Sequence, residues 1–359
     1  MSLELTPESL ESFLSTVKDP ETGREIGKTG QLASCEVNDG GARARIGLSS
    51  HSSPVKDYFT ESLREKFVAG FPGQKGLEIE LFTFERPAPK AGQIGLTAKS
   101  VIAVGSGKGG VGKSTVAASL ALGLKRAGCK VGLCDADVYG PSIPTLLGVQ
   151  GQPAQVDNKI QPLEYEGMPV MSIGFLVPPE QAVIWRGPML HSAVTQFLRD
   201  TAWGDLDYLI IDMPPGTGDI ALSISQMLPL TGSVVVCTPQ KVALLDAIKA
   251  VAMFQKVNIP VLGVVENMSG FVCPDNGKRY DIFGKGGARR FAEEVKVPFL
   301  GEIPLNMQIR TNGDDGEMMG CFEDPLVGPE LEKIVFQLSR SLADKNAVDP
   351  PKASLPVLG

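Results

Sequence analysis

The sequence of 359 residues has no uninterrupted apolar run close to the ~18 residues that a helix needs to cross a bilayer. Its first residues, Met-Ser-Leu-Glu-Leu, also lack the basic start and apolar core of a secretory signal peptide. We therefore expect a soluble, cytoplasmic protein without a membrane partner. With 43% hydrophobic residues, the chain can form a sizeable core and is long enough for two domains.

Cysteine is scarce, and no two cysteines form a C-x-x-C pair. The six cysteines are Cys35, Cys129, Cys134, Cys237, Cys273 and Cys321. Six scattered residues are too few for a disulfide scaffold in a chain of this length. Because Cys134 and Cys237 lie within apolar runs typical of strands, we expect most of the six to be buried thiols.

Positive charge is also in short supply. The 34 Lys and Arg residues against 41 Asp and Glu residues give a net charge of −7. Nonspecific nucleic-acid binding requires a basic surface that neutralises phosphates. The charge balance therefore argues against nucleic acid as a partner, and only a local basic patch would change that expectation.

The most informative stretch is residues 101–115, where an apolar β-branched run meets a glycine-rich turn and then a helix-forming segment. After Gly107 and four further residues come Gly112, Lys113 and Ser114, which is the Walker A spacing of a phosphate-binding strand–loop–helix. Glycines let backbone N–H groups turn toward phosphate oxygens, and the following helix presents its positive dipole end. Lys113 adds a charge, and Ser114 offers a hydroxyl to Mg²⁺.

This motif predicts a nucleoside triphosphate ligand, and the alternative is an ordinary glycine turn between a strand and a helix. The residues predicted to bind the nucleotide in the loop are Gly107, Lys108, Gly109, Gly110, Val111, Gly112, Lys113, Ser114 and Thr115.

Near-continuous apolar runs follow the loop at intervals long enough for crossover helices. These runs cover residues 130–137, 168–175, 207–213, 233–239, 261–268 and 299–304. Strands that are apolar on both faces are typical of a mainly parallel sheet with helices on both sides. We therefore predict an α/β fold, with a doubly wound P-loop ATPase domain over residues 100–345.

The N-terminal residues follow a different pattern. The expected elements, in α-β-β-α-β order, are a helix to about residue 17, strands at 31–37 and 42–48, a helix over 58–69 and a strand at 77–84. We predict a small α+β domain over 1–85, a linker rich in proline and glycine over 86–99, and a disordered tail over 346–359.

Carboxylates follow the predicted strands at the sheet edge where ligands gather in such folds. Asp212 comes directly after an apolar run, in the Walker B position that holds Mg²⁺, and the alternative is a plain strand-end aspartate. The next loop, 213–219, has spare N–H groups that can respond to the γ-phosphate. We predict that Asp137 orients the attacking water. Asp135 is its rival, and we expect only one of the two to face the phosphate.

A second lysine inside the glycine-rich loop, Lys108, makes this loop similar to the deviant Walker A motif of dimeric ATPases such as MinD, ParA and the nitrogenase iron protein. That resemblance implies that Lys108 reaches across a dimer interface to the phosphates of the other subunit.

Nearly the whole chain resembles the Mrp/ApbC-type iron–sulfur cluster carrier ATPases, through residues 135–144, 185–188, 212–219, 238–240 and 266–269. The N-terminal part resembles the small metal–sulfur cluster assembly domain often fused ahead of that ATPase.

The family resemblance implies a Mg²⁺-dependent ATPase that acts as a homodimer and delivers clusters to client apoproteins or assembly factors. It implies catalytic roles for Lys108, for Lys113 as the P-loop lysine and for Asp137 as the water-orienting carboxylate. The other roles that it implies are Mg²⁺ ligation by Ser114 and Asp212 and an adenine contact by Asn267.

The chain departs from this family where a cluster would bind. Members usually carry C-x-x-C at this place, so that two cysteines per subunit hold a [4Fe–4S] cluster across the homodimer. Here Cys273 is present, and Asn276 takes the second position, although asparagine is a poor ligand for soft iron–sulfur centres. We therefore expect a degenerate site, in which Cys273 is either a cluster ligand or an inert loop thiol.

In the N-terminal domain, residues 49–54 stand where such domains often have a cysteine, and we interpret His51 as a solvated loop histidine.

Two other functions stay open at this point. One is a nucleotide-gated dimeric scaffold or regulator without a cluster, in which hydrolysis only resets the complex. The other is a positioning ATPase similar to MinD or ParA, which needs a basic amphipathic helix or a basic patch. The helix expected over 331–343 is followed by a proline-rich tail, which disfavours that role.

Overall fold

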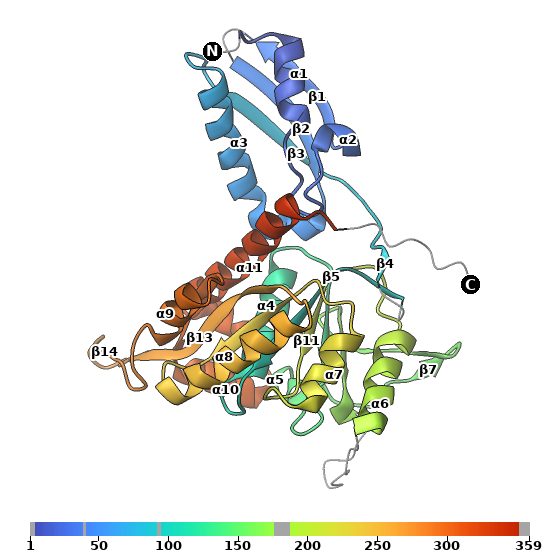
Figure 1. The fold of residues 1–359 in the computed structure, drawn as a ribbon, viewed down its shortest axis with the longest axis vertical. Coiled ribbons are helices and arrows are strands. Elements are labelled where there is room, and N and C mark those ends of the chain that lie inside the picture. The colour runs from blue at the N-terminus through green and yellow to red at the C-terminus, as the bar shows by residue number, and fades with distance from the viewer. Residues whose placement is uncertain (1–3, 39–40, 92–94, 176–186, 352–359) are drawn as a thin grey trace. The chain divides into compact units, whose positions relative to one another are not determined.

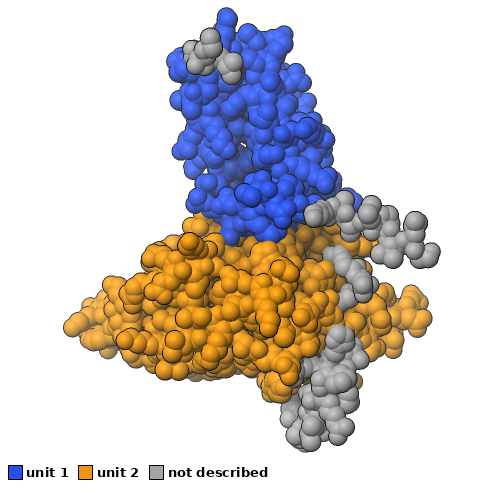
Figure 2. Space-filling model, viewed as in Figure 1, with its two compact units in different colours: residues 1–87, 127–129, 339–353 blue, residues 88–126, 130–338, 354–359 orange. Residues whose placement is uncertain are grey.

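The computed structural model describes residues 4–38, 41–91, 95–175 and 187–351. The chain forms two compact units, one of residues 1–87, 127–129 and 339–353 and the other of residues 88–126, 130–338 and 354–359 (Figure 2). No helix within the described ranges is both long and apolar enough to cross a membrane.

The first unit contains a three-stranded sheet, the helices α1 and α3, and the C-terminal part of α11 (Gly328–Val348). Helix α1 (Pro7–Ser15) begins at Thr6, whose hydroxyl accepts the N–H of Ser9 at 3.2 Å while Ser9 accepts the N–H of Thr6 at 2.9 Å. The strands are β1 (Leu32–Asn38), β2 (Gly41–Leu48) and β3 (Leu77–Thr83), with β1 antiparallel and β3 parallel to β2. A parallel pair needs a crossover, which α3 (Lys56–Gly70) provides. The predicted α-β-β-α-β order is confirmed, with a short α2 (Ile26–Thr29) added.

The first unit has its own apolar core, to which helix residues four apart contribute. Leu10 and Leu14 of α1 and Leu63 and Phe67 of α3 are buried together with Ile46 of β2. This spacing places both members of each pair on the same side of their helix, which explains why the helices cover the sheet.

The prediction of a solvated His51 is wrong. This side chain is only 3% exposed, and it belongs to the 3₁₀ helix η1 (Ser50–Val55). The Cys129 thiol donates a hydrogen bond of 3.2 Å to the carbonyl of Ser50 in the same segment. Residues 49–54 therefore form an ordered, partly buried segment of the first unit.

The second unit contains a ten-stranded sheet of order β14-β13-β12-β5-β11-β6-β10-β9, with β15 paired to β13 and β4 paired to β5 (Figure 1). The strands are β4 (Lys90–Ala91), β5 (Leu96–Ser106), β6 (Val131–Asp135), β9 (Leu163–Tyr165), β10 (Met168–Ser172), β11 (Leu206–Asp212), β12 (Gly232–Cys237), β13 (Val261–Val272), β14 (Arg279–Tyr280) and β15 (Phe299–Leu305). β4, β9 and β14 pair antiparallel, and the other pairs are parallel. The predicted doubly wound, mainly parallel sheet is confirmed. β7 (Gln155–Val156) and β8 (Lys159–Ile160) form a separate ribbon.

Helices cover both faces of this sheet. Helix α4 (Lys113–Arg126) packs on β5, β6 and β11, next to α5 (Ile143–Leu146) and η3 (Met318–Glu323), and α10 (Met307–Asp315) contacts α5 and η3. Helices α6 (Gly187–Asp200), α7 (Asp219–Met227), α8 (Lys241–Lys256) and α9 (Gly287–Glu294) contribute to the core of the other face. Phe254 of α8 lies so close to β5 that a Cβ at Gly105 would come within 2.9 Å of its ring. The remaining helices are η2 (Ile173–Phe175) and α11 (Gly328–Val348).

Several predicted boundaries differ from the structure. β5 begins at Leu96, inside the stretch predicted as a linker, because Lys99 forms a buried 2.8 Å ion pair with Asp207 and draws this stretch into the sheet. β6 ends at Asp135, two residues earlier than predicted. α11 continues to Val348, so residues 346–348 of the predicted tail are helical. Residues 352–359 of that tail, like residues 185–186 of the segment 185–188, lie outside the described residues.

Candidate nucleotide-binding site

The glycine-rich loop between β5 and α4 lines a hollow of about 440 Å³ at the C-terminal edge of the sheet. The loop residues that line it are Lys108, Gly109, Gly110, Gly112, Lys113, Ser114 and Thr115. Asp137, Tyr139 and Pro215 reach the same hollow from other segments. The strand–loop–helix predicted from the sequence is therefore present, with α4 beginning at Lys113.

Two glycines of the loop have no room for a side chain. Gly112 has φ = +79°, and a Cβ there would lie 2.1 Å from the Nδ2 atom of Asn267. A Cβ at Gly107 would lie 2.0 Å from the backbone oxygen of Asp246 in α8. The loop is therefore held closely by β13 on one side and α8 on another.

Lys113 brings together the charged groups of the site. Its Nζ lies 2.5 Å from Asp212 Oδ1, 3.4 Å from Asp137 Oδ2 and 3.2 Å from Ser114 Oγ. The Lys113 side chain is only 5% exposed, and a buried ammonium of this kind requires carboxylate partners. The sheet supplies them, because Asp212 at the end of β11 pairs in register with Val104 of β5 and with Asp135 of β6.

Asp212 has one oxygen that can accept a cation. Its Oδ2 is buried and has no hydrogen-bond partner among the described residues, whereas Oδ1 is taken by Lys113. Burial raises the pKa of Asp212, and the charge of Lys113 opposes that rise. This buried Oδ2 atom and the Ser114 hydroxyl, whose interaction with Asp212 also opposes the rise of that pKa, are a donor set that fits Mg²⁺.

The structure separates the two rival carboxylates. Asp135 is fully buried, and it accepts hydrogen bonds from Asp137 N at 3.0 Å, Ile143 N at 3.3 Å and Ser172 Oγ at 3.0 Å. Burial, and next the charge of Asp212, raise the pKa of Asp135 to about 8. Asp135 therefore organises the backbone after β6 and does not line the hollow.

Asp137 does line the hollow. Its Oδ1 accepts the N–H groups of Tyr139 at 3.2 Å and Gly140 at 3.4 Å, which leaves Oδ2 directed at Lys113. Residues two apart on a continuous strand share a face. The two aspartates point differently because β6 ends at Asp135 and the chain turns before Asp137.

The side chain of Lys108 is partly exposed at the edge of the hollow. Its backbone oxygen accepts a 2.9 Å hydrogen bond from Ser106 Oγ, and within the described residues its ammonium forms no ion pair. The structure therefore leaves this charge open to a ligand from outside the protomer.

Asn267 contacts the loop from β13. Its Nδ2 donates to the Val111 oxygen at 2.9 Å, and its Oδ1 accepts the Met268 N–H at 3.0 Å. The Asn267 side chain is buried, with 6% of the residue exposed, and it holds the loop backbone through the bond to Val111. The adenine contact expected for Asn267 stays a prediction. The sequence placed Asn267 at the site but did not show its bond to Val111, and it missed Ser172, because the strand order decides that Ser172 lies beside Asp135.

The predicted cluster ligand lies elsewhere, in the turn between β13 and β14. Cys273 donates its N–H to the Lys278 oxygen at 3.0 Å, and its own oxygen accepts the Gly277 N–H at 2.8 Å. Cys273 is half-buried, and Asn276 is exposed with its Oδ1 bonded to the Lys278 N–H at 2.9 Å.

No group of three or more His, Cys, Asp or Glu that could hold a metal occurs among the described residues. Of the other cysteines, Cys129, Cys134, Cys237 and Cys321 are buried thiols, as predicted, and Cys35 is half-buried.

A glycine-rich loop before a helix, with a buried lysine–aspartate pair at the edge of a parallel sheet, defines a P-loop nucleotide-binding protein. The family model described as ParA, NUBPL iron-transfer P-loop NTPase, matches residues 97–339. An iron–sulfur cluster carrier protein of Deinococcus radiodurans is 46% identical over 333 residues, which cover 92% of this chain and 91% of that protein. The protein of the same description from Synechocystis is 42% identical over 325 residues, covering 87% and 90%. This chain therefore belongs to the iron–sulfur cluster carrier family of P-loop NTPases.

Solved structures share this fold. A nucleotide-binding protein of Archaeoglobus fulgidus in complex with ADP superposes with a TM-score of 0.58 at 41% identity, covering 64% of this chain and 90% of that chain. The cell division ATPase MinD of Pyrococcus furiosus, at 24% identity and a TM-score of 0.50, covers 66% and 97% and shares the fold.

Replacing Gly112 with alanine should weaken nucleotide binding at least ~10-fold, equivalent to about 1.4 kcal/mol. The new Cβ strains a backbone at φ = +79° and displaces Asn267 from Val111. Titration with a fluorescent ADP analogue measures the loss. Gly140→Ala is the matched control, because Gly140 lines the same hollow and a Cβ there meets nothing within 4 Å. Equal affinities of the two variants would contradict the role given to Gly112.

Replacing Asp137 with asparagine should lower ATP turnover roughly 100-fold or more, because the amide is a weaker acceptor for water. Nucleotide affinity should change little. Asp135→Asn should have the smaller effect on turnover, since Asp135 bonds the backbone outside the hollow. Steady-state phosphate release and ADP-analogue binding separate turnover from affinity. A larger loss of turnover in Asp135→Asn would reverse the two roles.

Proposed function

We propose that this protein is a carrier of iron–sulfur clusters in which a homodimer hydrolyses ATP with Mg²⁺ and thereby controls delivery of the cluster to client apoproteins or assembly factors. The observation that carries the proposal is the buried Lys113–Asp212 pair beside the 440 Å³ hollow. Relatives of nearly the full length of this chain are described as iron–sulfur cluster carrier proteins, which supports the choice of cargo.

The nucleotide chemistry follows from the residues that line the hollow. Ser114 and Asp212 would hold Mg²⁺, which neutralises charge on the β- and γ-phosphates when it is bound. Lys113 orients the same phosphates, and its 3.4 Å contact holds the Asp137 carboxylate beside them. Asp137 then orients a water molecule toward the γ-phosphate. Pro215 of the loop 213–219 lines the hollow, and Gly216 N–H bonds the Ser106 oxygen at 2.9 Å, so this loop can respond to the nucleotide.

The homodimer in this proposal depends on Lys108. Its ammonium has no ion-pair partner within the described part of the protomer, and it stands at the edge of the hollow. In a two-fold dimer each Lys108 would reach the phosphates bound by the other subunit, and each subunit would complete its neighbour's site. ATP binding would therefore favour the dimer.

The cargo site in this proposal is the turn that contains Cys273. A two-fold dimer offers two Cys273 thiolates, whereas a [4Fe–4S] cluster requires four ligands. Cys321 is buried against Asn312 Nδ2, 3.5 Å from its sulfur, and so it does not supply a surface thiol. We propose that the cluster is held weakly and completed by thiols of a donor or client protein, in the cytoplasm.

The second candidate is a nucleotide-gated scaffold that carries no cluster. Asn276 in the second ligand position favours this alternative. A positioning ATPase similar to MinD is disfavoured, because α11 buries its apolar residues Leu331, Ile334 and Leu338.

Replacing Lys113 with alanine should nearly abolish ATP hydrolysis, because it removes the charge nearest the β- and γ-phosphates. Lys108→Ala should bind ATP like the parent and lose hydrolysis together with ATP-dependent dimerisation. Phosphate release, nucleotide titration and sedimentation velocity measure the three properties. Parent-level hydrolysis in Lys113→Ala would contradict the nucleotide site, and parent-level hydrolysis in Lys108→Ala would contradict only the role across the dimer.

Replacing Asn276 with cysteine should raise the amount of iron and sulfide that remains bound after exposure to a chelator, because it restores C-x-x-C in the same turn. The parent should hold little, and Cys273→Ala should hold none. Anaerobic reconstitution, followed by iron and sulfide counting per dimer, makes the comparison. A stable, stoichiometric cluster in Cys273→Ala would exclude this turn as the cargo site, and no gain in Asn276→Cys would favour the scaffold.

A further inference from the structure

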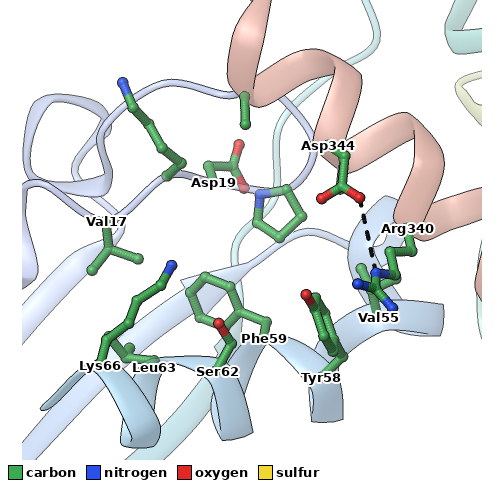
Figure 3. A pocket seen from close by; sticks show the side chains of 14 residues that line it. Val17, Asp19, Val55, Tyr58, Phe59, Ser62, Leu63, Lys66, Arg340 and Asp344 are labelled. Carbon is green, nitrogen blue, oxygen red and sulfur yellow. Dashed lines mark ion pairs between the residues drawn. The ribbon is translucent and has the colours of Figure 1, made fainter. Parts of the chain in front are cut away.

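The first unit contains a hollow that the nucleotide and cargo chemistry does not use (Figure 3). We call it the α3–α11 pocket, because it is lined by α3, by the C-terminal part of α11 and by residues 17–20, all of which belong to that unit. Its volume is about 150 Å³. A cavity of this size admits a group comparable to benzene, and it is too small for a nucleotide or a larger cofactor.

The walls of the α3–α11 pocket are mainly apolar. Phe59 and Leu63, one turn apart on α3, form one side together with Val55. Ala343 and Ala347, one turn apart on α11, form the other side, and their short side chains leave the space open. The pocket therefore favours an aliphatic side chain of four or five carbons over a polar group.

The rim of the pocket carries charges of both signs, and the anions are already paired. Asp19 accepts hydrogen bonds from Thr22 Oγ1 at 2.6 Å, Gln31 Nε2 at 3.1 Å and Arg86 Nη2 at 3.0 Å. Asp344 lies 3.9 Å from Arg340. These carboxylates therefore add little attraction for a cation.

The rim has one cation without a partner in the described residues. Lys18 lies 3.8 Å from Glu25, and the guanidinium of Arg340 lies 4.7 Å from the centre of the Tyr58 ring. Lys66 forms no hydrogen bond or ion pair within the described ranges, and Figure 3 shows it extending from α3 beside the pocket. An anion at the rim would therefore be attracted to Lys66.

We propose that the α3–α11 pocket docks a peptide segment of a partner protein, which inserts one aliphatic side chain and sets a neighbouring carboxylate against Lys66. A single anchored side chain in a preformed pocket is a common source of affinity in protein interfaces. The carboxylate fixes the orientation of the segment and selects acidic partners. The inference concerns the first unit alone and does not rest on nucleotide hydrolysis or on a bound cluster.

The test uses the full chain without nucleotide or iron, and methyl NMR signals of Leu63 and Ala343 report binding. The probe is acetyl-Glu-Leu-Glu-amide, compared with acetyl-Gln-Leu-Gln-amide and acetyl-Glu-Ala-Glu-amide. We expect the first peptide to bind, and each replacement to weaken it about fivefold or more. Equal affinity for all three peptides, or no shift of these signals with the first, would overturn the proposal.

Two kinds of variant separate charge from packing. Lys66→Glu should weaken the acidic peptide about fivefold and leave the glutamine peptide unchanged, whereas Lys75→Glu should change neither. Lys75 is the matched control, being an exposed lysine of the same unit outside the pocket.

Ala343→Leu and Ala347→Leu should each fill the pocket and abolish binding of both peptides, with thermal melts to show that the variants are folded. Undiminished binding of the acidic peptide in Lys66→Glu, or in a folded filling variant, would overturn the proposal. In all of these variants ATP hydrolysis should be unaffected.

Discussion

The buried ammonium of Lys113 is the constraint around which the nucleotide site is arranged. An ammonium removed from water is stable only next to anions, and here Asp212 and Asp137 are those anions. Asp212 is in place because β11 pairs between β5 and β6, which aligns the ends of the three strands. The charge of the site is therefore set by the order of the strands, and burial of Asp135 with a raised pKa limits the repulsion among its carboxylates.

Strand β13 and helix α8 hold the nucleotide loop against the rest of the second unit. Asn267 bonds the Val111 oxygen from β13, and the close approach of Gly107 to Asp246 brings α8 against the loop. β13 then continues to Val272, directly before Cys273. The nucleotide loop is therefore hydrogen-bonded to the same strand that leads into the turn with Cys273, and a shift of the loop backbone can reach that turn through the Asn267–Val111 bond and six residues of chain.

The first unit is organised by a buried polar network as well as by its apolar core. Arg86 lies 3.0 Å from Asp19 and 3.2 Å from Glu21, and Ser49 donates a short hydrogen bond to the other oxygen of Glu21. Each charge of this network has a partner of opposite sign, and removing one partner would leave an uncompensated buried charge, which is strongly destabilising. The network joins the residues after α1 to the segment before η1 and to the chain that leaves β3, and it also holds Asp19 at the rim of the α3–α11 pocket.

The sequence alone determined the P-loop, the parallel sheet and the α-β-β-α-β order of the first unit, because these depend on local spacing and on apolar runs along the chain. It also located Asp137 and Asp212 after strands and identified the loss of the second cysteine at Asn276. Tertiary structure decided which aspartate faces the hollow, because that depends on β6 ending at Asp135. It also decided that Asn267 holds the loop and that His51 is buried, since both depend on segments far apart in sequence. The α3–α11 pocket could not be read from the sequence either, because a hollow exists only where the side chains of two helices leave a gap between them.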